Sequence, residues 1–232
     1  PWETMHFNVE GHLEHTGLLF IPSSKPFNLF EPDRKNSIKL YVKRVFITDD
    51  CQELVPPYLR FLRGVIDSQD LPLNVSRELL QASPILDLIR KDVTKRTLNA
   101  LTNKAKKKPE DYATFWETFG PVMKEGLYED MDNKDKLLEI ARFKSSADEG
   151  WVGLGQYKER MVEGQEAIYY LIGEDLEAMK RSPHLEGFKA KGIEVLFLND
   201  AVDGFWTSMI RDYDGTELKS VTRGSDDLGK IK

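Results

Sequence analysis

The stretch DLPLNVSRELLQ (Asp70–Gln81) joins a turn-forming, proline-containing loop to a short segment with helical spacing. Ser76 is a good N-cap for that segment, because its hydroxyl can accept a hydrogen bond from a backbone N–H in the first turn. Arg77 and Gln81 are four residues apart, so a helix places both on one face. The stretch therefore predicts a short helix that follows a mobile loop and presents a guanidinium and an amide together.

Arg77 and Gln81 admit two interpretations. A planar guanidinium beside an amide donor suits the recognition of phosphoryl oxygens. In the alternative, Arg77 pairs with a nearby acid such as Asp70 or Glu78, and Gln81 is simply solvated. Most exposed arginines form such pairs, so the residues alone favour the second interpretation.

The residues before this stretch predict a sheet. Alternating apolar residues over 5–9 and 13–21 predict two strands joined by a turn. A third strand is predicted at 38–42, continuing into 45–47. Strands with such short connections indicate a half-buried mixed or antiparallel sheet.

Helices predominate after the stretch. Ser83–Pro84 supplies an N-cap followed by a proline at the first helical position, and apolar residues then recur at three- and four-residue steps as far as Leu101. The basic run Lys104–Lys108 ends at Pro109 and marks a boundary. Aromatic residues at helical spacing follow, in a helix that is expected to close at Gly120–Pro121.

The last third of the chain has a different pattern. Residues 145–155 are small, polar and glycine-rich, and they predict a linker. Apolar strands at 168–172 and 193–198 then alternate with short helices. Such alternation indicates a small parallel α/β unit.

Composition excludes several classes of protein. The chain has 232 residues, with 33 basic and 39 acidic side chains and a net charge of −6. No apolar run approaches the roughly 20 residues that a membrane-spanning helix needs. The single cysteine, Cys51, cannot form an internal disulfide, which fits a reducing, cytoplasmic setting. Because the chain opens on Pro1–Trp2, we expect it to be part of a longer protein.

No motif of a self-contained catalytic centre is present. The sequence lacks the glycine-rich phosphate loops GxGxxG and GxxxxGK[ST] and the GxSxG nucleophile elbow. Its four histidines lack Cys, Asp or Glu partners at ligand spacing, so we expect no metal site. An independent enzyme is therefore disfavoured.

Two further groups of residues have both a structural and a functional interpretation. Residues 90–108 hold eight basic side chains, which could bind nucleic acid or an acidic protein; without interleaved aromatic residues, a solvated helix face is favoured and nucleic acid is not expected. A stand-alone binding module that uses this face is the alternative function. Phe205, Trp206 and Met209 are expected in the core, with an exposed apolar patch as the other possibility.

The Asp70–Gln81 stretch resembles the middle-domain signature of the ninety-kilodalton heat-shock chaperone family, especially its bacterial branch, high-temperature protein G. Further segments match that family in order, and the resemblance covers essentially the whole chain. These segments are LLFIP (18–22), KLYVKRVFI (39–47), RGVIDS (63–68) and EGQEAIYY (163–170).

The resemblance implies an α/β (α+β) fold in three parts. Residues 1–106 would form a large αβα sandwich, truncated at its N-terminal side. Residues 107–146 would form a helical connector, and residues 147–232 a smaller αβα sandwich. The order of sheet, helices, linker and small α/β unit in the residue pattern agrees with this division.

The resemblance also implies the middle segment of an ATP-dependent chaperone of the stress response. In the family, the arginine of the Ser-Arg-Glu stretch, here Arg77, reaches the γ-phosphate of ATP, and the glutamine one turn later, here Gln81, supports it. Phe46, Leu71 and Leu73 stand at the positions that dock the nucleotide-binding domain. Phe205, Trp206 and Met209 are a candidate surface for client proteins.

The expected cofactors and partners lie outside the chain. ATP and its Mg²⁺ would be bound by an N-terminal domain of the same protein, and a C-terminal domain would form the homodimer. Non-native client proteins are the expected substrates of the whole cytoplasmic chaperone. This segment by itself is expected neither to bind ATP strongly nor to hydrolyse it.

Overall fold

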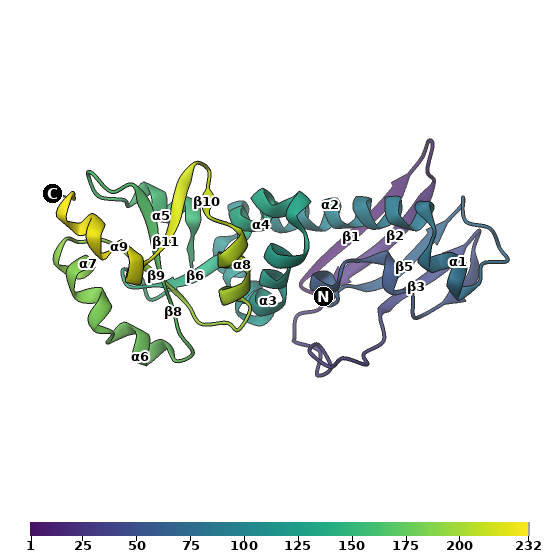
Figure 1. The fold of residues 1–232 in the computed structure, drawn as a ribbon. Helices are drawn as coiled ribbons and strands as arrows, with labels where there is room; N and C mark the ends of the chain where they lie inside the picture. Colours follow the sequence, from purple (N-terminus) through teal and green to yellow (C-terminus); the bar gives the residue numbers. More distant parts are fainter. Residues whose placement is uncertain (232) are drawn as a thin grey trace. The chain divides into compact units, whose positions relative to one another are not determined.

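The computed structural model describes residues 1–231, and the chain divides into two compact units. The first unit is Pro1–Phe119 and the second begins at Gly120. Each unit contains one sheet with its own helices (Figure 1). The predicted mixed α/β class is therefore confirmed. The division at 106 and 146 into three parts stays a prediction.

The sheet of the first unit is mixed and has the strand order β1-β2-β5-β3-β4. β3 and β5 are parallel, and the other neighbouring pairs are antiparallel. Buried and exposed residues alternate along β1, β2 and β3, as expected for strands with one face in the core. The strands are β1 (Glu3–Val9), β2 (His15–Ile21), β3 (Ser37–Val42), β4 (Val45–Thr48) and β5 (Arg63–Ser68).

The chain reverses direction between β3 and β4, so the prediction that one strand continues through 38–47 is wrong. Lys43 and Arg44 both have positive φ, +49° and +67°, as in the two-residue turns whose twist matches that of a hairpin. The backbone N–H of Arg44 donates to the carboxylate of Asp67, at 3.1 and 3.2 Å from its two oxygens. This bond to β5 holds a turn that neither residue type favours.

Helices cover the face of this sheet that carries Phe7 and His15. His15 Nε2 lies 2.9 Å from Asp92 Oδ2 on α2, and the guanidinium of Arg96 stacks over Phe7. The predicted cap is confirmed, because Ser83 Oγ accepts from the N–H of Leu86. The helical segments are η1 (Gln52–Leu54), η2 (Pro57–Leu59), α1 (Arg77–Gln81), α2 (Pro84–Lys107) and α3 (Pro109–Glu129).

The helix that begins at Pro109 does not end at Gly120–Pro121, as the sequence predicts, but runs on to Glu129. A proline inside a helix removes one hydrogen bond and costs about 3 kcal/mol. Phe119, Val122 and Met123 are all buried around it. Burial of these side chains offsets the cost of the proline, so the helix continues.

The sheet of the second unit has the order β10-β11-β8-β9-β6-β7, with β11, β8 and β9 parallel. This confirms the predicted parallel α/β unit and adds antiparallel strands at both edges. The strands are β6 (Arg142–Ser145), β7 (Val152–Gly153), β8 (Ala167–Ile172), β9 (Val195–Leu198), β10 (Asp212–Tyr213) and β11 (Thr216–Ser220).

Helices pack on both faces of this second sheet. Met179 on α6 and Phe188 on α7 share a core with Tyr169 and Phe197 on one face. Phe143 on β6 points to the other face and packs against Trp206 of α8. The helical segments are η3 (Met131–Asn133), α4 (Lys134–Ile140), α5 (Leu154–Glu159), α6 (Leu176–Lys180), η4 (Pro183–Leu185), α7 (Glu186–Ala190), α8 (Asp203–Met209), α9 (Val221–Gly224) and η5 (Ser225–Gly229).

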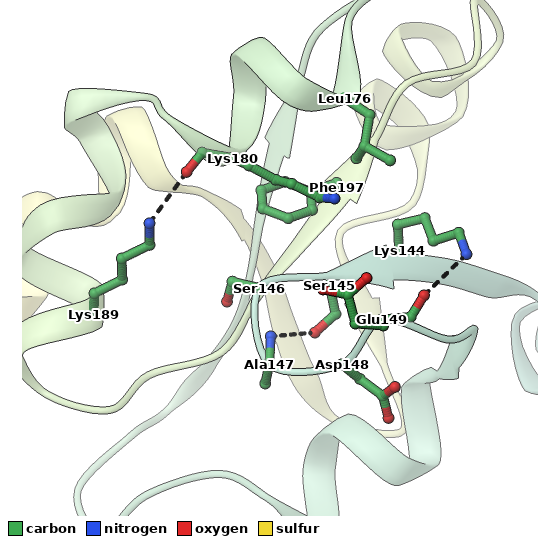
Figure 2. A pocket seen from close by; sticks show the side chains of 10 residues that line it. All are labelled: Lys144, Ser145, Ser146, Ala147, Asp148, Glu149, Leu176, Lys180, Lys189 and Phe197. Carbon is green, nitrogen blue, oxygen red and sulfur yellow. Dashed lines mark hydrogen bonds between the residues drawn. The ribbon is translucent and has the colours of Figure 1, made fainter.

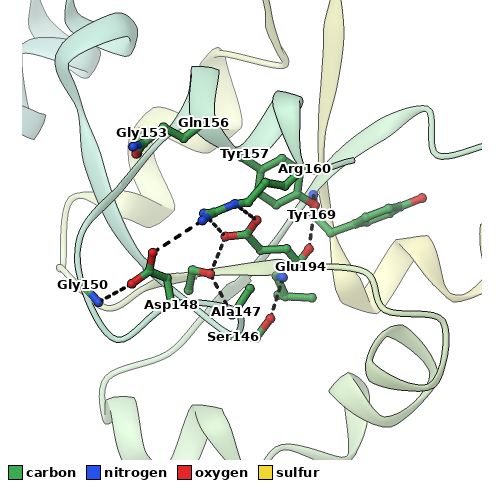
Figure 3. A network of polar contacts seen from close by, with 12 residues as sticks. Ser146, Ala147, Asp148, Gly150, Gly153, Gln156, Tyr157, Arg160, Tyr169 and Glu194 are labelled. Carbon is green, nitrogen blue, oxygen red and sulfur yellow. Dashed lines mark hydrogen bonds and ion pairs between the residues drawn. The ribbon is translucent and has the colours of Figure 1, made fainter. Parts of the chain in front are cut away.

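The predicted linker at 145–155 is wrong, because these residues belong to the β6–β7 hairpin and its polar support (Figure 3). Arg160 donates from Nε and Nη2 to the buried carboxylate of Glu194, at 3.1 and 2.8 Å. Ser145 Oγ donates to the same carboxylate, and Tyr157 donates to the Glu194 carbonyl. Asp148 accepts from Arg160 at 3.5 Å. The polar residues of 145–155 therefore belong to an ordered hydrogen-bond network around Glu194 and Arg160, and not to a flexible linker.

Gly64 provides a test of the close approach between β5 and β2. Its φ is +133°, and a Cβ at this position would lie 2.0 Å from the Leu18 carbonyl oxygen. We expect Gly64→Ala to lower the free energy of unfolding by about 2–4 kcal/mol, measured from the denaturant midpoint. Gly11→Ala is the matched control, since Gly11 has φ +124° but open space around its Cα. Equal losses for the two variants would contradict the steric explanation.

Candidate functional site

The predicted helix at Arg77–Gln81 is present as α1, and its two polar residues line one cavity. Ser76 Oγ accepts from the N–H of Leu79 at 3.3 Å, which confirms the predicted cap. The cavity has a volume of about 250 Å³ and lies between α1, the end of β4 and η1. Arg77 and Gln81 therefore share one face, as their spacing predicts.

Arg77 is loosely held. Its Nη2 atom lies 4.0 Å from Asp50 Oδ2, and 77% of its side chain is exposed. Its ion pair is with Asp50 and not with Asp70 or Glu78, the two acids considered from the sequence, and the Asp70 carboxylate accepts from the backbone N–H of Glu14 at 2.6 Å. An exposed pair at this distance contributes about 0–1 kcal/mol. The guanidinium can therefore leave Asp50 at little cost.

The loop before Arg77 is anchored at its start, and its middle is exposed. Ser68 Oγ accepts from the backbone N–H of Leu71 at 3.2 Å, and the Leu71 side chain is 2% exposed. Two residues later, Leu73 is 53% exposed. The sequence prediction grouped Leu71 with the docking residues, but its side chain lies in the core, where it anchors the loop.

Apolar side chains are exposed near the candidate site. Phe46 is 52% exposed on β4 and packs edge-on against Tyr41, with ring centroids 5.7 Å apart. The sequence predictions missed Val45 and Leu79, which are also exposed. Leu79 could have been found from the sequence, because two adjacent leucines on one short helix point in different directions and only Leu80 is buried.

Cys51 lies beside the cavity but is not a nucleophile candidate. It is buried, and burial together with the neighbouring Glu53 carboxylate raises the pKa of its thiol to about 12. A thiol with so high a pKa stays protonated at neutral pH, and the thiolate is the reactive form.

In the second unit, the structure separates the three residues proposed for client binding. Phe205 is 60% exposed and Met209 is also exposed, whereas Trp206 is 1% exposed. The Trp206 indole donates to Asp203 Oδ1 at 2.7 Å, so this residue belongs to the core. Tyr128 packs edge-on against Phe205 at 5.9 Å, and the three exposed side chains form an apolar patch, Tyr128–Phe205–Met209.

A buried ion pair positions the helix that carries this patch. Lys124 Nζ on α3 donates to both carboxylate oxygens of Asp203 at 3.0 Å, and it also lies 2.9 Å from Asp200. Asp203 is completely buried, and Lys124 is nearly so. Removing one partner would leave the other charge buried without compensation. The pair therefore fixes α8 against α3.

Another cavity, of about 430 Å³, lies between the β6–β7 hairpin and helices α6 and α7 (Figure 2). Its three lysines already have partners. Lys189 donates to the Lys180 carbonyl, Lys144 to the Glu149 carbonyl, and Lys180 to Glu177. Of these three lysines only Lys180 is paired with a charged side chain, and the lining mixes them with Asp148 and Glu149, so the cavity shows no charge of a single sign.

Comparisons with known proteins decide the family. The model of the Hsp90 protein family matches residues 1–231. The chain belongs to the Hsp90 protein family. It is 55% identical over 232 residues to the chaperone protein HtpG of Paramagnetospirillum magneticum, and 55% identical over 231 residues to that of Roseobacter denitrificans. Each match covers the whole of this chain but only 37% of the relative.

A solved structure agrees with this assignment. The chain superposes on a structure described as the middle domain of a Plasmodium falciparum heat shock protein with a TM-score of 0.83 and 33% identity. The match covers 95% of this chain and 87% of that one. The resemblance to the heat-shock chaperone family and the α/β fold expected from it are therefore confirmed. The roles of individual residues in this Hsp90 family member stay predictions.

The basic segment of this Hsp90 family member is partly neutralised. Lys104 Nζ lies 2.8 Å from Glu3 and 3.4 Å from Asp111, and its hydrogen bond to Glu3 raises its pKa. Arg90 pairs with Asp87, and Arg96 with Asp92. These pairs weaken the case for a continuous surface that binds nucleic acid.

Residues 1–231 contain neither a cluster of metal-ligating side chains nor a membrane-spanning helix. No group of three or more His, Cys, Asp or Glu side chains there is arranged to hold a metal ion. No helix in this range combines the length and the apolar character required to cross a membrane.

The Lys124–Asp203 pair can be tested by removing its cation. We expect Lys124→Met to lower the free energy of unfolding of the second unit by about 3–5 kcal/mol. The free energy is measured by urea titration, with tryptophan fluorescence as the signal. Lys180→Met is the control, because the Lys180–Glu177 pair is more exposed and should change stability by less than about 1 kcal/mol. A loss no greater than that of the control would mean that the buried pair does not hold α8.

Proposed function

We propose that this chain is the middle segment of an ATP-dependent chaperone and supplies Arg77 to ATP held by the N-terminal domain of the same protein. The observation that carries the proposal is a loosely paired, 77% exposed guanidinium at a short capped helix. Gln81 lines the same cavity and would support the arginine through its amide. Family membership supports the assignment of the whole protein as a chaperone.

The charge of Arg77 suits the chemistry of ATP hydrolysis. ATP hydrolysis develops charge on the γ-phosphoryl group, and the Mg²⁺ bound with the nucleotide neutralises part of it. An arginine that arrives from another domain stabilises the rest and contributes about 10³–10⁵ in rate. Arg77 is suited to this role because breaking its long contact with Asp50 costs little.

Exposed apolar residues supply a way to make hydrolysis depend on domain closure. Phe46 and Leu73 lie in the same unit as Arg77 and are both about half exposed. We propose that the N-terminal domain covers these two residues when it closes. Burial of their apolar surface would favour closure, and only the closed state would bring Arg77 to the phosphate.

The apolar patch Tyr128–Phe205–Met209 is the proposed contact for non-native proteins. Unfolded chains expose apolar side chains, and an exposed aromatic patch on a rigid helix can bind them. The chain spans about a third of the length of its relatives. The proposed homodimer and its C-terminal interface therefore belong to the full-length protein. These parts of the proposal rest on the family.

Replacing Arg77 in the full-length protein tests the catalytic role. We expect Arg77→Ala to lower the ATPase kcat by at least about 100-fold, because the transition-state charge loses its partner. ATP affinity, measured by equilibrium titration, should stay within about twofold, since the nucleotide is held by another domain.

Arg90→Ala is the matched control, since Arg90 is a partly exposed arginine of the same unit that lies outside the cavity. It should leave kcat unchanged. An unchanged kcat in the Arg77 variant would contradict the catalytic role.

Replacing Phe205 tests the apolar patch. The measurement is the concentration of full-length protein that suppresses aggregation of a chemically denatured model protein. We expect Phe205→Ser to raise this concentration by about fivefold or more. Leu88→Ser, at an exposed apolar residue of α2 in the other unit, is the control and should act like the unaltered protein. Equal effects of the two substitutions would remove the special role of the patch.

A further inference from the structure

A groove of about 340 Å³ lies in the second unit at the carboxyl ends of the parallel strands β8 and β11, beside α8. Crevices outside the carboxyl ends of parallel strands are the usual ligand sites of α/β folds. None of the functions proposed above uses this groove. Its polar lining includes two arginines, Arg211 and Arg223, the Lys219–Glu217 side of β11, and hydroxyl-bearing residues of β8, α8, β11 and α9.

Two arginines supply the charge of the groove. Arg211 follows α8 and Arg223 lies in α9, and both residues are exposed. Neither guanidinium has a hydrogen bond or ion pair to any of residues 1–231. The backbone of Arg211 is fixed, because its carbonyl accepts from the N–H of Leu218 on β11 at 2.8 Å. Two positive charges are therefore held at one groove without an ion pair to any of the described residues, although the Glu217 carboxylate borders the same groove.

The hydroxyl groups contribute one further donor. Thr207 and Ser208 donate their protons to helix carbonyls, those of Asp203 and Phe205. Ser220 Oγ and Thr222 Oγ1 are 2.9 Å apart, and only one of them can donate to the other. Whichever one accepts keeps its own proton free. The groove thus combines two guanidinium forks with at least one free O–H group.

The acidic side chain of β11 does not cancel this charge. Ser220 pairs with Tyr170 across the sheet, so these two side chains share the face of the groove. Glu217 and Lys219 border the groove, but their side chains alternate toward the Tyr169 face, where Lys219 bonds to Asp227 at 2.7 Å and Tyr169 donates to the same carboxylate. The hydrogen bond from Lys219 lowers the pKa of Asp227. The Lys219–Asp227 ion pair therefore lies on the face of the sheet opposite to Ser220 and Tyr170.

We propose that this groove binds the dianionic phosphate of a phosphate monoester. A phosphoryl group has three oxygens and close to two charges, which match two bidentate guanidinium groups and one hydroxyl. A carboxylate has two oxygens and one charge and would leave one arginine unpaired. The monoester can belong to a nucleotide or to a phosphorylated side chain, since both present the same group.

The 232-residue chain is suited to the test, because the solved middle domain that it matches corresponds to a chain of nearly the same extent. Isothermal titration at low ionic strength would use three probes: inorganic phosphate, adenosine monophosphate and a short phosphoserine peptide. We expect at least one monoester to bind. Arg211→Gln and Arg223→Gln should each weaken that binding by about tenfold, the equivalent of one lost charge-assisted contact.

Arg181→Gln is the matched control, because it removes the same charge from an exposed arginine of the same unit outside the groove. It should leave the affinity within about twofold. Preference for the nucleotide or for the peptide identifies the source of the phosphate. The proposal is overturned if no phosphate probe binds, if the control weakens binding as much as the groove variants, or if an unphosphorylated glutamate peptide binds equally well.

Discussion

The arrangement of the first unit depends on two buried leucines that flank an exposed arginine. Leu71 lies in the core, and Leu80 anchors α1 from the other side. Between them the chain has a cap at Ser76 and a guanidinium whose nearest acid, Asp50, is 4.0 Å away. Burial fixes both ends of the segment, while its centre is held only by a weak, exposed contact. This constraint presents Arg77 without committing it to a partner inside the unit.

The second unit differs, since two networks of charged side chains fix the elements that carry its exposed surfaces. Lys124 and Asp203 fix α8, and Arg160 and Glu194 fix the β6–β7 hairpin (Figure 3). Because Lys124, Asp203 and Glu194 are buried with partners, the elements that they support are held in place. The apolar patch around Phe205 and the groove at Arg211 both depend on α8. Such rigid support contrasts with the loosely held arginine of the first unit.

Local sequence signals predicted much of the fold. Caps at Ser76 and Ser83, the alternation of β1 to β3 and the parallel strands of the second unit follow from patterns of a few residues. The failures depend on distant contacts. The turn at Lys43–Arg44 relies on Asp67, the passage of α3 through Pro121 relies on burial, and the ordered segment at 145–155 relies on Glu194. Sequence spacing brought Arg77 and Gln81 together correctly, but it could not show that Leu71 and Trp206 are buried.

The role proposed for Arg77 is to act on a nucleotide held by another domain. The most direct measurement adds increasing amounts of the 232-residue chain to the separately purified N-terminal nucleotide-binding domain and follows ATP hydrolysis. We expect a saturable rise in rate that Arg77→Lys largely abolishes, because an ammonium cannot reproduce the bidentate geometry. An equal rise with the variant, when both chains bind the domain equally well, would contradict that role.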